Sequence, residues 1–307
     1  MEEGLDVPVL LITFKRPETT TKVFEAIRKA RPKKLFIFSD GPRNEVEKKK
    51  VEEVRKIVSK VDWDCEVKTS FQKTNLGMVI GVLGSISWFF DNVEEGIIFD
   101  DDCVPTQEFF KFCSEMLEKY RDDERIMHIC GSNFQRGWSR DKYSYYFSKH
   151  TNAWGWASWR RARNKYDGKM RYYPELIKKK YLVDIFPNIL ERKYMEKNFN
   201  DAYYRNPGAI DVKWTFAVIA NNGLSIVPSK NLVRNIGFEE TSTNTKPIDS
   251  FFSLSPKKLD FPLMHPPGVI HDRKSDWRFM SWILRHKIKK HFLLKSGIYK
   301  IFKTLKS

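Results

Sequence analysis

The chain has 307 residues, of which 41% are hydrophobic and 14% aromatic. A chain of this length and composition can bury a large core, which excludes an intrinsically disordered protein and indicates one large domain or two closely packed ones. Its 55 basic and 39 acidic residues give a formal net charge of +16. This excess favours a polyanionic neighbour: nucleic acid, anionic lipid or a phosphorylated substrate.

The cysteines and the first residues of the chain bear on the compartment in which the protein works. Cys65, Cys103, Cys113 and Cys130 show neither the paired spacing of a metal site nor a dense disulfide pattern, which favours a reducing compartment. The opening MEEGLDVPVLLITF is acidic where a signal peptide needs basic residues, and its apolar run is too short to cross a bilayer. We therefore expect a cytoplasmic protein.

Strands and helices are predicted to alternate along the first part of the chain. β-rich runs predict strands at residues 7–14, 33–40, 65–71 and 95–100. Between and after them, apolar residues at helical spacing predict helices at 16–30, around Val51, Val54 and Val58, at 75–92 and at 106–120. The apolar length of the third helix predicts that it is buried. This alternation predicts an α/β fold with a mostly parallel sheet and helices on both faces.

Charged side chains follow three of these strands at the point where each strand ends. Arg16 comes after the first strand, Asp40 after the second, and Asp100, Asp101 and Asp102 after the fourth. Parallel sheets bind their ligands at the carboxyl ends of the strands, at a topological switch point. We therefore expect these side chains to converge on one crevice.

The three consecutive aspartates indicate a metal site. Adjacent carboxylates repel one another and raise each other's pKa unless a cation or hydrogen-bond donors compensate them. Mg²⁺ or Mn²⁺ is a suitable cation, because these ions share one or two protein carboxylates with substrate phosphates. The alternative is that the aspartates cap the helix that begins near Thr106. Capping uses one side chain rather than three, so the sequence favours the metal site.

Four segments in order carry a resemblance to a known family: ITFKRPETT, FIFSDGPR, NLGMVIGVLGSISWFF and EEGIIFDDDCVPTQEFF. They resemble the GT-A glycosyltransferases, in particular bacterial sequences related to the N-acetylglucosaminyltransferase I group, and the match extends over residues 7–240. The resemblance implies a GT-A (Rossmann-like) fold in which the acidic triplet is the DxD motif.

The same resemblance implies roles for the residues at the strand ends. Asp102 would bind the Mn²⁺ or Mg²⁺ ion that bridges the two phosphates of the donor. Asp100 and Asp101 would face its ribose and sugar. Arg16 would approach the diphosphate, and Asp40 would hold the uracil ring.

A group of tryptophans opens the second half of the chain. The segment HTNAWGWASWRRARNKYD (150–167) contains Trp154, Trp156 and Trp159 and resembles the family's WGWATW segment. Aromatic faces suit the apolar faces of sugar rings, but each of these side chains can equally belong to the core. We assign only Trp156 to the sugar-binding site.

A candidate catalytic base lies further along the chain. The segment GAIDVKWTFAVIANNGLSIVPSKNLVRNIGF (208–238) resembles a family pattern in which Asp211 matches the presumed base. Transfer with inversion needs one carboxylate to take the proton from the attacking acceptor hydroxyl. The alternative is a solvated aspartate or a helix cap before Val212.

One departure from the family pattern bears on metal and phosphate binding. Relatives read ATHT where this chain reads TSTNT, so that Asn244 replaces a histidine. If that histidine aids metal or phosphate binding, its function has moved or been lost. His265 and His271 are candidate substitutes, but a single histidine is more often structural, and we leave both out of the predicted site.

The end of the chain, residues 276–307, is a basic tail with nine basic residues and one acidic residue. Its apolar residues Ile298, Ile301, Phe302 and Leu305 form a helical stripe. A basic amphipathic helix binds anionic membrane surfaces, and a helix docked on the catalytic domain is an equally open alternative. Because the charge gathers in this tail and no nucleic-acid-binding module is recognisable, we expect no nucleic-acid partner.

Together these features predict a GT-A domain over residues 1–275, with a nucleotide-sugar-binding half (1–130), an acceptor-binding half (131–275) and the basic tail. We expect a metal-dependent, inverting hexosyltransferase or N-acetylhexosaminyltransferase that acts in glycan biosynthesis. Its donor would be a UDP-sugar and its acceptor a glycan or lipid-linked glycan, with the tail on the inner membrane face. The alternatives are a nucleotidyltransferase that forms a sugar nucleotide and a catalytically silent glycan- or membrane-binding protein. The sequence lacks the Gly-rich opening of the former.

Overall fold

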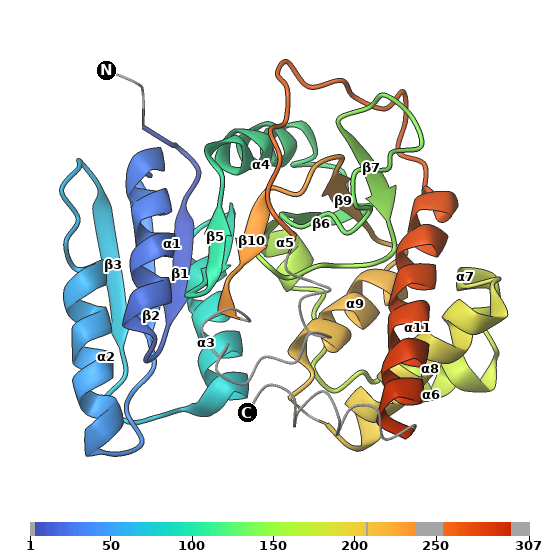
Figure 1. Ribbon diagram of the computed structural model, residues 1–307, viewed down its shortest axis with the longest axis horizontal. Coiled ribbons are helices and arrows are strands. Elements are labelled where there is room, and N and C mark those ends of the chain that lie inside the picture. The colour runs from blue at the N-terminus through green and yellow to red at the C-terminus, as the bar shows by residue number, and fades with distance from the viewer. Residues whose placement is uncertain (1–3, 207, 238–253, 296–307) are drawn as a thin grey trace.

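Eight strands form one mixed sheet at the centre of the molecule (Figure 1). The computed structural model describes residues 4–206, 208–237 and 254–295, with side chains as far as residue 288. In spatial order the sheet is β3-β2-β1-β4-β8-β6-β9-β7, and only β8 and β7 run opposite to the other strands. The strands are β1 (Val9–Thr13), β2 (Lys34–Ser39), β3 (Glu66–Phe71), β4 (Glu95–Asp100), β6 (Ile126–Cys130), β7 (Tyr145–Ser148), β8 (Trp156–Trp159) and β9 (Leu224–Pro228).

Helices cover both faces of this sheet, which confirms the predicted α/β class with a mostly parallel sheet (Figure 1). The first half of the chain contributes α1 (Pro17–Ala30), α2 (Glu45–Val58), α3 (Gly77–Asn92) and α4 (Gln107–Lys119). The second half contributes α5 (Arg160–Arg163), α6 (Tyr173–Lys178), α7 (Leu182–Ile185), α8 (Ile189–Tyr204), α9 (Ile210–Ala220) and α11 (Arg273–Lys295).

The central strands are apolar on both faces because both faces are covered. On β1, Val9 and Leu11 pack with α1 and α4 in one hydrophobic cluster. Leu10 and Ile12 point the other way and pack with α3 and α9 in a second cluster. A strand that is buried on both faces has a continuous apolar sequence, which is why β1 could be predicted from the sequence.

Two of the predicted helices show how local sequence determines the structure. Asn44 caps α2, because its Oδ1 accepts a hydrogen bond of 3.0 Å from the backbone N–H of Glu47. The prediction that α3 is buried is wrong for its first turns, where Met78 and Ile80 are 66% and 64% exposed. The far end of the helix is buried at Phe89 and Phe90, whereas its start borders the pocket described below.

A third hydrophobic cluster joins the helices at one edge of the molecule, α6 to α9 and α11. Helix α11 begins at Arg273, because the Asp272 carboxylate accepts hydrogen bonds from the backbone N–H groups of Lys274 and Ser275. Met280 and Ile283 are buried in the third cluster. The first part of the predicted tail is therefore a helix docked on the body, whereas its stripe at 298–305 lies outside the described residues.

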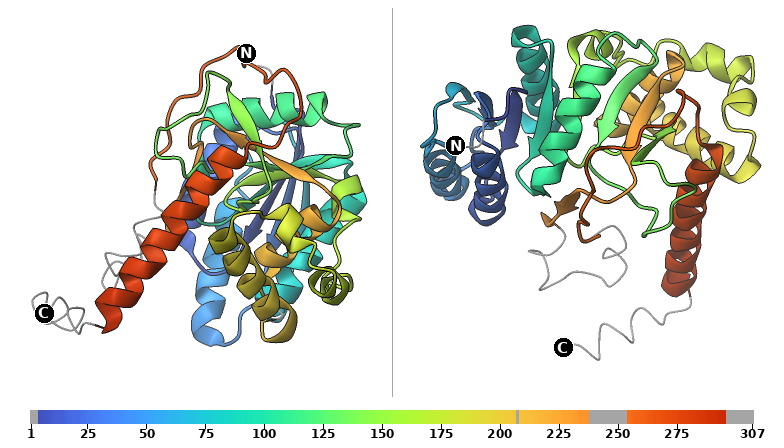
Figure 2. Two further views of the ribbon diagram at one scale, coloured as in Figure 1. Left: turned by 90° about the vertical axis from the view of Figure 1, so that its right-hand side faces the viewer. Right: turned by 90° about the horizontal axis from the view of Figure 1, so that it is seen from above.

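The division of the chain into two halves and a tail stays a prediction, and both halves contribute strands to the same sheet. Helix α11 runs along the edge of the molecule, and its far end projects beyond the body (Figure 2). Within the part of the chain that the structure describes, no helix combines the length and the apolar content needed to cross a bilayer.

Candidate functional site

A cavity of about 750 Å³ lies at the carboxyl ends of β1, β2 and β4, beside the start of α3 and the start of α9. The chain runs from β1 to β2 and β3 on one side and then crosses to β4 on the other, so the cavity sits at the switch point of the strand order. The residues predicted for the site all line it: Arg16, Asp40, Asp100, Asp101, Asp102, Trp156 and Asp211. The expected convergence is confirmed, whereas the role of each residue stays a prediction.

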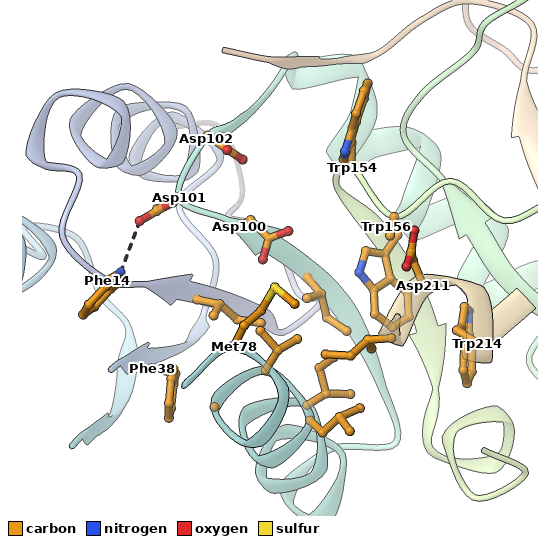
Figure 3. A pocket seen from close by; sticks show the side chains of 18 of the residues that line it. Phe14, Phe38, Met78, Asp100, Asp101, Asp102, Trp154, Trp156, Asp211 and Trp214 are labelled. Carbon is orange, nitrogen blue, oxygen red and sulfur yellow. Dashed lines mark hydrogen bonds between the residues drawn. The ribbon is translucent and has the colours of Figure 1, made fainter. Parts of the chain in front are cut away.

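The acidic triplet is partly compensated by an arginine rather than left to repel itself. Arg16 Nη2 lies 2.6 Å from Asp101 Oδ1, and its Nη1 lies 2.6 Å from Asp102 Oδ2. The backbone N–H of Phe14 donates a further hydrogen bond of 3.2 Å to Asp101 Oδ2 (Figure 3). The capping alternative is wrong, because β5 (Cys103–Pro105) separates the triplet from α4 and no side chain caps that helix.

Asp100 differs from its two neighbours. It is the last residue of β4 and lies at the centre of the pocket in Figure 3, and no described residue donates a hydrogen bond to its carboxylate. Burial, together with the charges of Asp102 and Asp101, raises its pKa to about 7. Burial also raises the pKa of Asp101, to about 6, although Arg16 opposes the shift. Asp100 therefore presents an unsatisfied carboxylate to whatever enters the pocket.

Asp40 connects the end of β2 to the start of α3. Its Oδ1 accepts hydrogen bonds of 2.8 Å from the backbone N–H groups of Gly41 and Leu76, and its Oδ2 accepts one of 2.9 Å from Asn75 Nδ2. The side chain is buried, yet it still lines the cavity. Asp40 thus fixes the local backbone and keeps one oxygen with capacity for a further donor.

The aromatic residues of the second half divide between the core and the pocket. Trp159 is a core residue, whereas Trp154 and Trp156 line the cavity. Trp156 stacks on His128, with ring centroids 5.1 Å apart, and Trp214 donates a hydrogen bond of 3.1 Å from Nε1 to His128 Nδ1. Burial lowers the pKa of His128 to about 4, so its ring is neutral and acts as a rigid support for the two tryptophans.

Asp211 reaches the same pocket from the other half of the chain. It lies in the first turn of α9, where no side-chain cap is present, so the alternative of a helix cap is wrong. Its side chain is exposed and lines the cavity. Figure 3 shows it near Trp156, on the side of the pocket opposite Phe14 and Asp101.

Several residues that line the pocket were not predicted from the sequence. Arg43 lines the cavity and forms an ion pair with Glu47, which Lys15 also contacts at 2.5 Å. Asn235, at the end of β10 (Val233–Asn235), reaches the pocket because β10 pairs with β5 directly after the triplet. Asn75 and Asn235 gave no periodic signal, since both act through contacts between distant segments.

The donor set of the triplet fits a divalent cation only together with a ligand. In the part of the chain that the structure describes, no group of three or more His, Cys, Asp or Glu side chains could hold a metal ion by itself. Three carboxylates facing the single guanidinium of Arg16 nevertheless leave a negative site made of hard oxygen donors. Asn244 lies outside the described residues. His265 and His271 do not line the cavity and instead contact Tyr145 and Asp276.

Comparison with known proteins gives no family. No protein-family model matches the chain, and none of the curated proteins matches it. Among solved structures, mouse xyloside xylosyltransferase 1 is 13% identical, with 70% of this chain and 81% of that chain covered and a TM-score of 0.33. The 4-diphosphocytidyl-2C-methyl-D-erythritol synthase of Anaerococcus prevotii is 9% identical, with 51% and 72% covered and a TM-score of 0.32.

The glycosyltransferase GlyE of Streptococcus pneumoniae is 10% identical, with 59% of this chain and 38% of that chain covered and a TM-score of 0.25. TM-scores this low carry no argument about function. The resemblance of the sequence to the N-acetylglucosaminyltransferase I group therefore stays a prediction.

Proposed function

We propose that the protein is a glycosyltransferase that moves a hexose or N-acetylhexosamine from a UDP-sugar to a glycan or lipid-linked glycan. One observation supports this proposal above the others. The residues that the sequence resemblance assigns to the donor, from the first half of the chain, share one cavity with Trp156 and Asp211 from the second half. A transferase needs donor and acceptor groups around a single reacting centre.

On the donor side, we propose that Asp102 holds a Mn²⁺ or Mg²⁺ ion, and that Asp100 and Asp101 face the ribose and sugar of the donor. The ion would supply charge neutralisation for the departing diphosphate. Arg16 lies against Asp101 and Asp102, where its guanidinium also favours binding of a phosphate. Asp40 would accept a hydrogen bond from the uracil ring while its contacts with Gly41 and Leu76 keep it in place.

On the acceptor side, Trp156 and Trp154 offer ring faces for sugar binding, and Asp211 is the proposed general base. Its carboxylate would take the proton of the acceptor hydroxyl while that oxygen attacks the anomeric carbon from the face opposite the diphosphate. The new glycosidic bond forms as the bond to the diphosphate breaks, and UDP leaves. The exposed position of Asp211 suits a base that must meet an incoming acceptor.

The test of this assignment is Asp211→Asn, with donor affinity and turnover measured in one preparation. The amide keeps the shape but cannot accept the proton, so turnover should fall by roughly 10²- to 10⁴-fold while UDP-sugar affinity stays unchanged. The matched control is Asp201→Asn, because Asp201 is a helical aspartate that pairs with Arg205 at 3.2 Å and does not line the cavity. Near-normal turnover of the Asp211 variant, or a parallel loss of donor affinity, would contradict the role.

The metal assignment is tested separately with Asp102→Asn. We expect the Mn²⁺-dependent part of UDP binding to disappear while the fold is kept, because the loss of one charge also relieves repulsion within the triplet. Unchanged Mn²⁺-dependent affinity would show that the triplet serves only as a partner for Arg16. Release of diphosphate from a nucleoside triphosphate would instead identify a nucleotidyltransferase, and UDP binding without turnover a silent protein.

A further inference from the structure

Residues 178–190 form a corner of the molecule in which three consecutive lysines precede a stretch with exposed apolar side chains. This lysine-rich corner spans the end of α6, all of α7 and the start of α8, which Figure 1 places together at one edge beside α11. Three consecutive lysines, Lys178 to Lys180, are exposed at its beginning, and Asp184 is its single acidic residue. The corner is therefore positively charged.

The apolar side chains of this corner are exposed beyond what the core requires. Leu182 and Phe186 are 3% and 2% exposed and anchor the corner in the third hydrophobic cluster. Four further large apolar residues point outward: Tyr181 (49% exposed), Val183 (44%), Ile189 (53%) and Leu190 (55%). Scattered single apolar residues are normal on a surface, but a group of this kind marks an interaction site.

The positive charge continues from the corner onto the neighbouring helix. Arg285 and Lys287 are exposed on α11, and Lys287 Nζ lies 4.3 Å from the centroid of the Tyr194 ring on α8. A surface with exposed apolar side chains beside lysines matches the boundary of an anionic bilayer. There the apolar groups enter the lipid while the ammonium groups stay at the level of the phosphates.

We propose that the lysine-rich corner docks the protein on an anionic membrane. The partner is a lipid surface of negative charge, and the corner binds it by electrostatic attraction together with shallow insertion of Tyr181, Val183, Ile189 and Leu190. The corner itself, residues 178–190, lies outside the basic tail, although Arg285 and Lys287 of the tail extend its charge. The contact does not depend on the proposed transfer chemistry.

The experiment measures binding of the full chain to vesicles of phosphatidylcholine, with and without phosphatidylglycerol, by co-sedimentation. Every variant keeps the tail, so a difference between variants reports the corner alone. Replacing Lys178, Lys179 and Lys180 by glutamine should weaken binding to the anionic vesicles by roughly fivefold each for Lys178 and Lys180, and by about 25-fold or more together. Lys179 should contribute less, because it already pairs with Glu175 at 2.7 Å. Added salt should weaken binding by the parent chain in the same direction.

The chain offers a matched control in Lys48, Lys49 and Lys50 on α2, a second run of three exposed lysines. That run is flanked by glutamates and has one large exposed apolar neighbour, Val46. The same replacement by glutamine there removes the same charge and should change binding by less than about fivefold. A second variant, Ile189→Ser with Leu190→Ser, keeps every charge and should weaken binding by roughly tenfold or more.

Three results would overturn the proposal. The first is an equal loss of binding in the two lysine variants, which would mean that net charge alone acts. The second is unchanged binding after the serine replacements. The third is failure of the parent chain to bind phosphatidylglycerol vesicles, which would leave an acidic protein as the partner of these lysines. Because neither donor nor acceptor is present, failure here leaves the proposed transferase activity untouched, and loss of activity leaves vesicle binding untouched.

Discussion

Two aspartates in different parts of the molecule have sharply different surroundings. Asp100, at the end of β4, faces the pocket without a described hydrogen-bond donor, and its pKa rises to about 7. Asp276, near the start of α11, accepts hydrogen bonds from the Ser148 hydroxyl (2.5 Å), the Lys149 backbone N–H (2.9 Å) and the His271 ring (2.6 Å). Although burial alone would raise the pKa of Asp276, the nearby His150 and His271 lower it.

The difference separates a structural carboxylate from one that is available to a ligand. Asp276 is satisfied by the protein and fixes α11 to β7, so its charge stabilises the folded chain. Asp100 is held in a position where its charge costs stability until a ligand or cation compensates it. Unsatisfied titratable groups in a cleft are typical of functional sites. We therefore expect the largest loss of stability when Asp276 is replaced. Smaller changes are expected when the charged groups beside Asp100 or Asp276 are replaced.

The largest effect should follow Asp276→Ala. This change leaves the Ser148 hydroxyl, the Lys149 N–H and His271 without their buried acceptor, so we expect the free energy of unfolding to fall by about 3–5 kcal/mol. Denaturant unfolding measures the loss. The control is Asp62→Ala, which breaks an exposed ion pair with Arg28 and should lower the stability far less, because solvent screens that pair. Similar losses in the two variants would remove the distinction between a buried and an exposed carboxylate.

A smaller loss should follow Arg16→Gln, because this arginine compensates Asp101 and Asp102. Its side chain is 46% exposed, so solvent screens the pair and we expect a loss of about 1–2 kcal/mol at neutral pH. The double variant with Asp101→Asn should recover part of that loss, since it removes a carboxylate that has lost its partner. A double-mutant cycle measures the coupling. Strictly additive effects would show that Arg16 does not neutralise the triplet.

The opposite sign is expected for Asp100→Asn, which should stabilise the chain above neutral pH. The unfolded carboxyl ionises near pH 4, whereas the folded one keeps its proton up to about pH 7. Across that window the folded state binds more protons, so stability falls as pH rises. The variant has no carboxyl group to ionise at this position, so it does not lose this stability. It should be more stable than the parent by about 1–2 kcal/mol at pH 8, but nearly equal at pH 4. Lower stability of the variant at pH 8 would contradict the comparison.

The smallest effect is expected for His150→Gln. Burial lowers the pKa of His150, but Asp276 and Glu191 outweigh burial and raise it above the ordinary value. A raised histidine pKa contributes stability that is complete below about pH 6.5 and is lost as pH rises through the folded value. The variant should therefore lose up to about 1 kcal/mol more at pH 6 than at pH 9, as measured by thermal unfolding. An equal loss at both pH values would mean that His150 acts only through packing.

The first half of the fold could be predicted because its signals are local. Runs of apolar residues predict β1, β2 and β4. The charged residues that follow these runs therefore lie at strand ends, which predicts that Arg16, Asp40 and the triplet share one pocket. The second half depends on pairings between distant segments. The sequence gives no local sign that β8 inserts between β4 and β6, or that β10 pairs with β5.

For the same reason, individual roles were harder to predict than positions. Trp156 and Trp159 stand three residues apart in one motif, yet one reaches the pocket and the other the core. Their alternation follows from the faces of β8, which only the sheet reveals. The sequence places Asp276 in the basic tail, because its partners Ser148 and Lys149 lie 128 and 127 residues away along the chain.

The pairing of β4 with β8 has a consequence for how this protein can change over evolution. Trp156 stands opposite Ile98 in the antiparallel register, two residues before Asp100. The backbone hydrogen bonds between β4 and β8 thus fix the position of Trp156 relative to the acidic triplet. Along the chain, residues 99–155 separate Ile98 from Trp156. Sequence changes in loops between residues 99 and 155 can therefore alter the pocket while Trp156 and the acidic triplet keep their relative positions. A shift of the ladder by a single residue, in contrast, would turn Trp156 to the opposite face of the sheet.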